Sequence, residues 1–66
     1  IQAANSWVGK DLIELDFSNK FNLIGVAFRR NGETILSDIA RLKIKRDDHL
    51  VLIGKYEDAE KLENMR

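Results

Sequence analysis

Two segments of the chain are apolar on both faces of an extended strand. Leu23–Phe28 reads Leu-Ile-Gly-Val-Ala-Phe, and neither of its faces is polar because side chains alternate along a strand. His49–Ile53 has the same character, and Gly54 ends it. Both segments are predicted strands that need cover on two sides. The alternation in the first strand assigns Leu23, Gly25 and Ala27 to one face and Ile24, Val26 and Phe28 to the other.

A hairpin is predicted after the first of these strands. Asn31 and Gly32 both tolerate the positive φ that a two-residue hairpin turn requires, so Thr34–Leu36 is the predicted returning strand. Further along, Arg41–Arg46 alternates between cationic and apolar residues, which indicates an extended segment. In that segment Leu42 and Ile44 share one face, and a turn at Asp47 and Asp48 follows it.

The stretch Val8–Phe17 has the pattern of a short amphipathic helix. We expect the helix to start at Gly9, with Asp11 in its first turn, where a carboxylate meets the positive end of the helix dipole. Asp16 and Ser18 are competent caps, so a second short turn is predicted, closed by Asn22 in a left-handed conformation. The apolar positions spaced to line one side of the helix are Leu12, Ile13, Leu15 and Phe17.

The two ends of the chain complete the predicted order. Ile1–Ala4 is a candidate edge strand, and Lys55–Arg66 is a predicted helix. In that helix Ala59, Leu62 and Met65 recur at three-residue intervals, with Tyr56 on the same side. The order is βαβββα, which predicts a small α+β domain with helices on one face of a mainly antiparallel sheet.

Composition limits how such a domain is stabilised. The 66 residues include no cysteine and one histidine, which excludes disulfides and thiolate metal sites.

Eleven basic residues balance eleven acidic ones, so no positive field attracts nucleic acid or a membrane surface. The longest apolar runs are far too short to span a bilayer, and no signal segment opens the chain. Since Ile1 is not an initiator, we expect residues 1–66 to be one domain of a longer protein.

The unpaired strand faces predict association. Two short helices can cover one face of a small sheet but not both, and monomers avoid large apolar patches in water. We therefore expect a homodimer in which Leu23–Phe28 and His49–Ile53 lie against a second copy. The alternative is a neighbouring domain of a longer chain that covers the same face.

Four blocks in order resemble the RCK_C (TrkA-C) domain, the regulatory C-terminal subdomain of potassium channel and transporter regulators and of cation/proton antiporters. They are Val8–Phe17, Ile24–Arg30, Asn31-Gly32 and Asp48–Gly54, followed by an acidic closing helix. The resemblance implies a dimeric, cytosolic, non-catalytic domain that acts on a membrane transport module. Some members bind cyclic di-AMP in a groove at the dimer interface. On this chain the matching positions are Leu12, Ile13, Asp16, Phe17, Ser18, Asn19, Leu23 and Ile24.

The chain departs from the family pattern at several of its positions. Family sequences often carry a basic residue at the position of Ser18, glycine at those of Asn22 and Asp47, and prolines near Asp38–Ala40. With no cation at Ser18, Asn19, Lys20 or nearby cations are the candidates for phosphate contacts.

His49 is a further candidate ligand residue. It either contacts a base or phosphate at the dimer face, pointing the same way as Val51 and Ile53, or is an exposed residue at a strand end. A divalent-cation site formed with Asp47 and Asp48 is disfavoured, because neighbouring strand residues point to opposite faces.

The cationic positions of Arg41–Arg46 could meet phosphates, but a solvated edge strand is the favoured interpretation. No aromatic residue is interleaved with these cations, so no nucleic-acid polymer is expected as a partner. No nucleophile elbow or phosphate-binding glycine loop is present, so catalysis is not expected. A ligand-free dimerisation domain of the same fold is the alternative to a cyclic di-AMP sensor.

Overall fold

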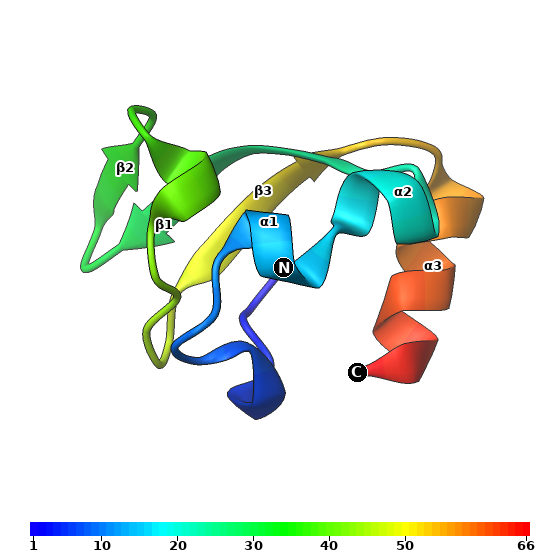
Figure 1. The fold of residues 1–66 in the computed structure, drawn as a ribbon, viewed down its shortest axis with the longest axis horizontal. Coiled ribbons are helices and arrows are strands. Elements are labelled where there is room, and N and C mark those ends of the chain that lie inside the picture. The colour runs from blue at the N-terminus through cyan, green and yellow to red at the C-terminus, as the bar shows by residue number, and fades with distance from the viewer.

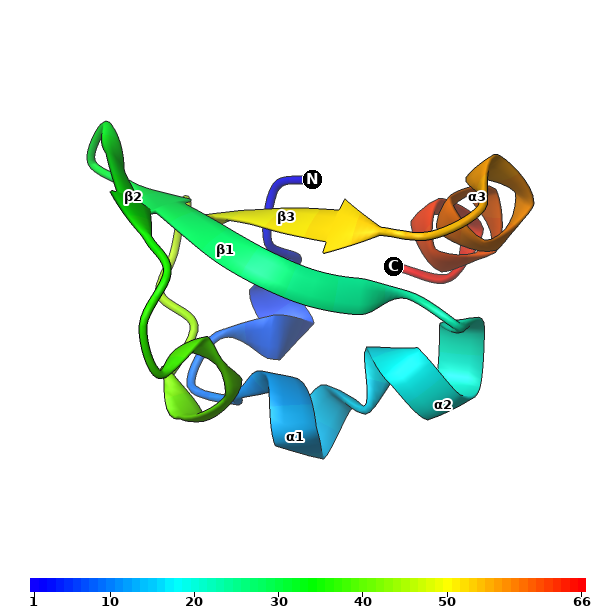
Figure 2. The same ribbon diagram turned by 90° about the horizontal axis from the view of Figure 1, so that it is seen from above.

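A computed structural model of residues 1–66 contains a three-stranded antiparallel sheet with the order β2-β1-β3. The strands are β1 (Ile24–Arg30), β2 (Glu33–Ile35) and β3 (His49–Ile53). The helices are α1 (Leu12–Leu15), α2 (Phe17–Phe21) and α3 (Tyr56–Met65), with two 3₁₀ turns, η1 (Asn5–Trp7) and η2 (Ile39–Arg41). α1 and α2 cover one face of the sheet, and α3 lies beyond the end of β3 (Figures 1 and 2). The predicted α+β class is confirmed, and no helix has the length and apolarity of a bilayer span.

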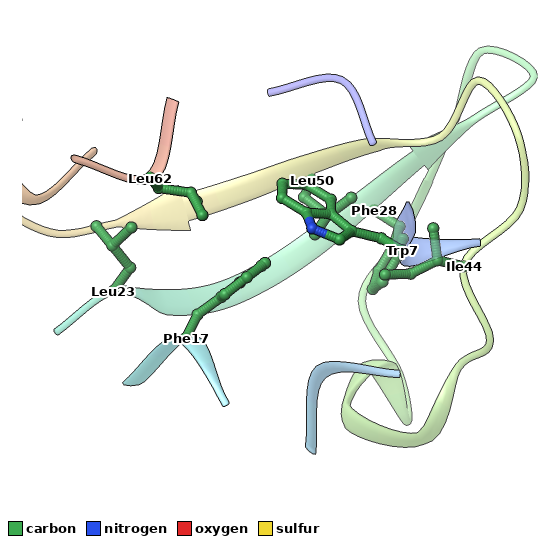
Figure 3. Packing of buried hydrophobic residues seen from close by; sticks show 7 residues of the cluster. All are labelled: Trp7, Phe17, Leu23, Phe28, Ile44, Leu50 and Leu62. Carbon is green, nitrogen blue, oxygen red and sulfur yellow. The ribbon is translucent and has the colours of Figure 1, made fainter. Parts of the chain in front are cut away.

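A small core lies between the sheet and the helices (Figure 3). Phe28 of β1 is completely buried at its centre. The rings of Trp7 and Phe17 meet edge to face with centroids 5.1 Å apart, a favoured aromatic geometry. The core residues come from every part of the chain: Trp7, Phe17, Leu23, Phe28, Ile44, Leu50 and Leu62.

The terminal segments differ in detail from the predictions. The expected strand Ile1–Ala4 is reduced to a single bridge between Gln2 and His49 at the edge of β3. In α3, Leu62 is buried but Tyr56 and Met65 are exposed, so the predicted four-residue apolar side is wrong. The reason is geometric. Each three-residue step along a helix falls about 60° short of a full turn, so these four side chains spread around the helix surface. The end of the sheet covers only the middle of this spread, where Leu62 lies.

The hairpin forms as predicted, and Asn31 and Gly32 have φ values of 52° and 79°. The predicted facing of β1 is wrong, because a β-bulge lies between Gly25 and Ala27. Gly25 pairs with Leu52 and Phe28 with Leu50, so these residues face the helices, while Ile24 and Ala27 face the other side. One extra residue reverses the alternation beyond it.

Arg41–Arg46 is not a strand of the sheet. It begins inside η2, and Ile44 then exchanges backbone hydrogen bonds of 2.8 Å with Gly9 and Lys10 of the loop before α1. The interpretation as a cationic edge strand is therefore wrong, because β2 and β3 already flank β1 and this segment pairs with the loop instead. Ile44 is buried, and Leu42 packs against the same core, as the alternation predicted.

The first helix starts later than expected. Gly9 has a φ of 86° and lies in the preceding turn, and α1 begins at Leu12. Asp11 is not in the first turn but is the N-cap, whose side chain accepts a hydrogen bond of 2.9 Å from the Glu14 N–H. A capping carboxylate satisfies a backbone donor that the helix cannot, which explains why the helix starts there.

Every non-glycine residue with positive φ is an aspartate or asparagine. These two residue types tolerate the left-handed region because their short polar side chains form local hydrogen bonds. Asn22 (φ 56°) closes α2 as predicted, and Asp47 (φ 68°) precedes β3. Glycine adopts a left-handed backbone without strain, so this backbone is consistent with the glycine that the family pattern leads us to expect at both positions.

Replacing Asn22 with alanine is expected to lower the free energy of unfolding by about 1 kcal/mol, because the left-handed conformation is less favourable for alanine than for asparagine. Asn64→Ala in α3 is the matched control, since Asn64 is exposed and helical. Urea titrations of the two variants test this. An equal effect of the two substitutions would contradict it.

Candidate functional site

A cleft of about 340 Å³ opens where the corner between α1 and α2 meets the start of β1 and η2. Seven of its ten lining residues are hydrophobic. The cleft is lined by Leu12, Ile13, Asp16, Phe17, Ser18, Leu23, Ile24, Gly25, Ile39 and Ala40.

The corner depends on the backbone of Asp16. This residue, with φ 52° and ψ 46°, ends α1 and begins α2, so the chain changes direction between the two helices. Phe17 is thereby turned into the core while still lining the cleft. The Asn19 side-chain amide donates to Asp16 Oδ1 at 3.0 Å. Asn19 thus supports the corner and does not itself line the cleft.

Gly25 allows α1 to lie close to β1. A Cβ atom at this position would be 2.6 Å from Leu12 Cδ1, a separation that side chains do not tolerate without movement. The bulge that follows Gly25 also keeps this position facing the helices. α1 and β1, which both line the cleft, can therefore lie in contact because glycine occupies this position.

Lys43 ties the segment after η2 to α1. Its Nζ lies 2.9 Å from Glu14 Oε1 and 3.3 Å from Asp11 Oδ2. The two carboxylates raise the pKa of Lys43, with Glu14 the larger influence. The pKa of Asp11 is lowered, chiefly by the hydrogen bond from the Glu14 N–H and then by Lys43. Lys43 is largely exposed, so its ion pairs with Asp11 and Glu14 add little to stability. Their main effect is to hold the segment after η2 beside α1.

The cleft continues onto an uncovered sheet face. β2 pairs only with Phe28–Arg30, so the first half of β1 has no strand neighbour on the cleft side. Ile24 lines the cleft and also stands opposite Ile53 on the sheet face away from α1 and α2. Both isoleucines are 60% exposed, and Val51 beside them is 41% exposed. An apolar surface therefore runs from the cleft onto the open sheet face.

Most of the predicted ligand residues meet in this cleft. Seven of the nine line it: Leu12, Ile13, Asp16, Phe17, Ser18, Leu23 and Ile24. His49 does not, because it begins β3 opposite Arg29, at the far end of the sheet from the Ile24–Ile53 pair.

Three lining residues were not predicted: Gly25, Ile39 and Ala40. The last two belong to Asp38–Ala40, a segment that stood out in the sequence only as a departure from the expected family pattern.

The Asp47–His49 segment is not arranged as a metal site. Asp48 is buried and accepts hydrogen bonds from Arg30 Nε at 2.8 Å and Arg30 Nη2 at 2.7 Å. Its carboxylate therefore points into the protein, away from the exposed Asp47 and His49. No three acidic, histidine or cysteine side chains of the domain are placed to hold one ion.

The sequence model of the TrkA-C domain family matches residues 1–65. The chain therefore belongs to the TrkA-C family, also called RCK_C, which is a family of regulatory domains and not of enzymes. This membership confirms the prediction that the domain is not catalytic. Among curated proteins, none matches the sequence.

Solved structures share the fold. The C domain of the potassium transport protein KtrA, in complex with cyclic diadenosine monophosphate, superposes with a TM-score of 0.92 at 24% identity, over 100% of this chain and 78% of its own. The RCK_C domain dimer of Streptococcus agalactiae BusR, in complex with the same ligand, gives 0.77 at 21% identity, over 94% and 76% of the two chains.

BusR in complex with promoter DNA gives the same TM-score, but the chain spans only 30% of that protein. The expectation of no nucleic-acid partner therefore does not hold for every protein that contains this fold.

Proposed function

We propose that this domain is a cytosolic sensor that binds cyclic di-AMP between two copies of itself and thereby regulates a potassium or other cation transport protein. The observation that carries the proposal is the cleft, where seven of the nine predicted ligand residues come together. The fold likeness to the KtrA domain, whose structure contains this ligand, supports the choice of ligand.

The chemistry of the cleft suits a cyclic dinucleotide. Apolar side chains can enclose the adenine rings, and a ligand with two-fold symmetry makes the same contacts with each copy. Asp16 is the one charged residue in the lining. Phosphate contacts then come from neutral donors such as the Ser18 hydroxyl, so we expect the affinity to depend only weakly on salt.

Regulation follows if the ligand favours one arrangement of the two copies. A ligand can shift a conformational equilibrium only by its difference in affinity for the two states. Contacts from both copies to one ligand provide such a difference. The membrane transport module, in the same chain or a separate one, would respond to that arrangement.

Cyclic di-AMP is expected to raise the melting temperature of the domain, because a ligand that binds only the folded state adds about 2.7 kcal/mol of stability at a concentration 100 times its Kd. Ile13→Gln should weaken binding about tenfold or more, since it removes an apolar contact from each half of the site. Leu36→Gln is the control, because Leu36 is also largely exposed but lies outside the cleft. Thermal unfolding and calorimetric titration provide the two measurements.

An unchanged melting temperature at saturating ligand would remove the sensor function. If light scattering still showed a dimer, that result would support the alternative, a ligand-free dimerisation domain. Equal loss of affinity in the two variants would place the ligand outside this cleft.

A further inference from the structure

A second concavity lies at the opposite end of the open sheet face. It has a volume of about 520 Å³ and no apolar lining residue. Its lining residues are Arg29, Asn31, Gly32, Asp47 and His49. None of them lines the apolar cleft, so this polar hollow is separate from the cleft and opposite to it in chemical character.

Arg29 and His49 stand together in this polar hollow. Arg29 of β1 and His49 of β3 are direct cross-strand partners, so their side chains lie on the same sheet face. The Arg29 guanidinium donates to Thr34 Oγ1 and forms no ion pair. Arg30, in contrast, is fully engaged by Asp48 and the Lys43 carbonyl. Arg29 therefore retains donors that are free for a ligand.

The hairpin turn adds backbone donors. Asn31 and Gly32 are consecutive left-handed residues, and their N–H groups donate to no other backbone group. Successive N–H groups in turn conformations form concavities that bind anions. These donors border the same hollow as the Arg29 guanidinium.

Asp47 restricts the kind of anion that fits. Its carboxylate lines the hollow and forms no ion pair with Arg29 or His49. A bare anion would be repelled by this carboxylate, whereas a ligand with both an anionic group and a hydroxyl group would satisfy both kinds of partner.

We propose that this hollow is a binding site for a small hydroxylated phosphate ester, of the sugar-phosphate or polyol-phosphate class. The phosphate lies against Arg29, His49 and the hairpin N–H groups, and a ligand hydroxyl donates to Asp47. The site is independent of the cleft proposed for cyclic di-AMP.

Amide NMR spectra of the ¹⁵N-labelled domain, titrated with glycerol 3-phosphate at about pH 6 and low salt, test the site. The amide signals of Asn31, Gly32 and His49 should shift together. Arg29→Gln should weaken binding about tenfold, the usual effect of losing a charge-assisted hydrogen bond. Arg41→Gln should leave it unchanged, because Arg41 is an exposed arginine outside the hollow.

Asp47→Asn gives a readout that general charge attraction cannot produce. It should weaken binding of glycerol 3-phosphate, because an amide oxygen is a weaker acceptor for the ligand hydroxyl than a carboxylate. It should strengthen binding of sulfate, an anion without hydroxyl groups, because the repelling charge of the carboxylate is removed. Asparagine also tolerates the left-handed backbone at this position, so the loop is retained. Unshifted hairpin amides, equal effects of the two arginine variants, or parallel changes for both ligands in Asp47→Asn would each overturn the proposal.

Discussion

Replacing Asp48 with asparagine is expected to lower the free energy of unfolding by about 3 kcal/mol, because it breaks a buried ion pair and leaves the Arg30 charge without its partner. Asp48 is 1% exposed and accepts three hydrogen bonds, two from Arg30 and one of 2.9 Å from the Lys45 N–H. The Arg30 side chain keeps 17% of its exposure, which places the effect at the lower end of the range for buried pairs. For a chain of 66 residues, this loss is a large share of the total stability.

The neighbouring residue provides the matched control. Asp47 is exposed, and Asp47→Asn keeps a residue that tolerates positive φ, so its effect should stay within about 0.5 kcal/mol. Urea unfolding of both variants near pH 7 measures the difference. Equal stabilities would show that the Arg30–Asp48 pair does not contribute to folding.

The pH dependence separates the ion pair from simple packing. The Arg30 guanidinium is the main cause of the lowered pKa of Asp48 in the folded protein. A carboxyl with a lowered folded pKa adds stability that is fully present above its unfolded pKa of about 3.9 and is lost as pH falls through the folded value. The difference in free energy of unfolding between the wild type and Asp48→Asn should therefore decrease steadily as the pH falls below about 4.

Local features of this fold were predictable because a few adjacent residues determine them. Asn31-Gly32 requires a tight hairpin turn, and Asn22 closes α2 in the left-handed conformation expected for it. Most of the predicted ligand residues lie in one short stretch of sequence. That stretch forms the corner between α1 and α2, so these residues are close together in the fold as well. Proximity in sequence was enough for that part of the site.

Features that join distant segments were not predictable in the same way. Asp48 reads as an ordinary turn residue, and only the fold brings it to Arg30, which lies 18 positions earlier in the chain. The reversed facing of β1 comes from a bulge, and its one sequence signal is Gly25, an isolated glycine within a strand pattern. Likewise η2 supplies Ile39 and Ala40 to the cleft from a segment that sequence periodicity assigned to no element.

Ile53→Glu is expected to convert a homodimer into a monomer. We propose that the second copy covers the apolar end of the open sheet face, which is formed by Ile24, Val51 and Ile53. Under a two-fold axis the substitution places one carboxylate from each copy in the interface, where an unpaired charge is strongly disfavoured. The dimer dissociation constant should rise at least about a hundredfold, as two lost isoleucine contacts alone would account for this.

The measurement is molar mass in solution by light scattering, together with urea unfolding of the monomeric variant. Because Ile53 is 60% exposed in the single chain, its replacement should leave the intrinsic stability of the fold nearly unchanged once dimerisation is accounted for. Leu36→Glu is the control, since Leu36 is 70% exposed and lies beyond β2, away from this surface. A wild-type monomer would contradict the need for a second copy. If Ile53→Glu still formed a dimer, the interface would have to lie elsewhere than on the open sheet face. If a monomeric variant still bound cyclic di-AMP, ligand binding would not require dimerisation.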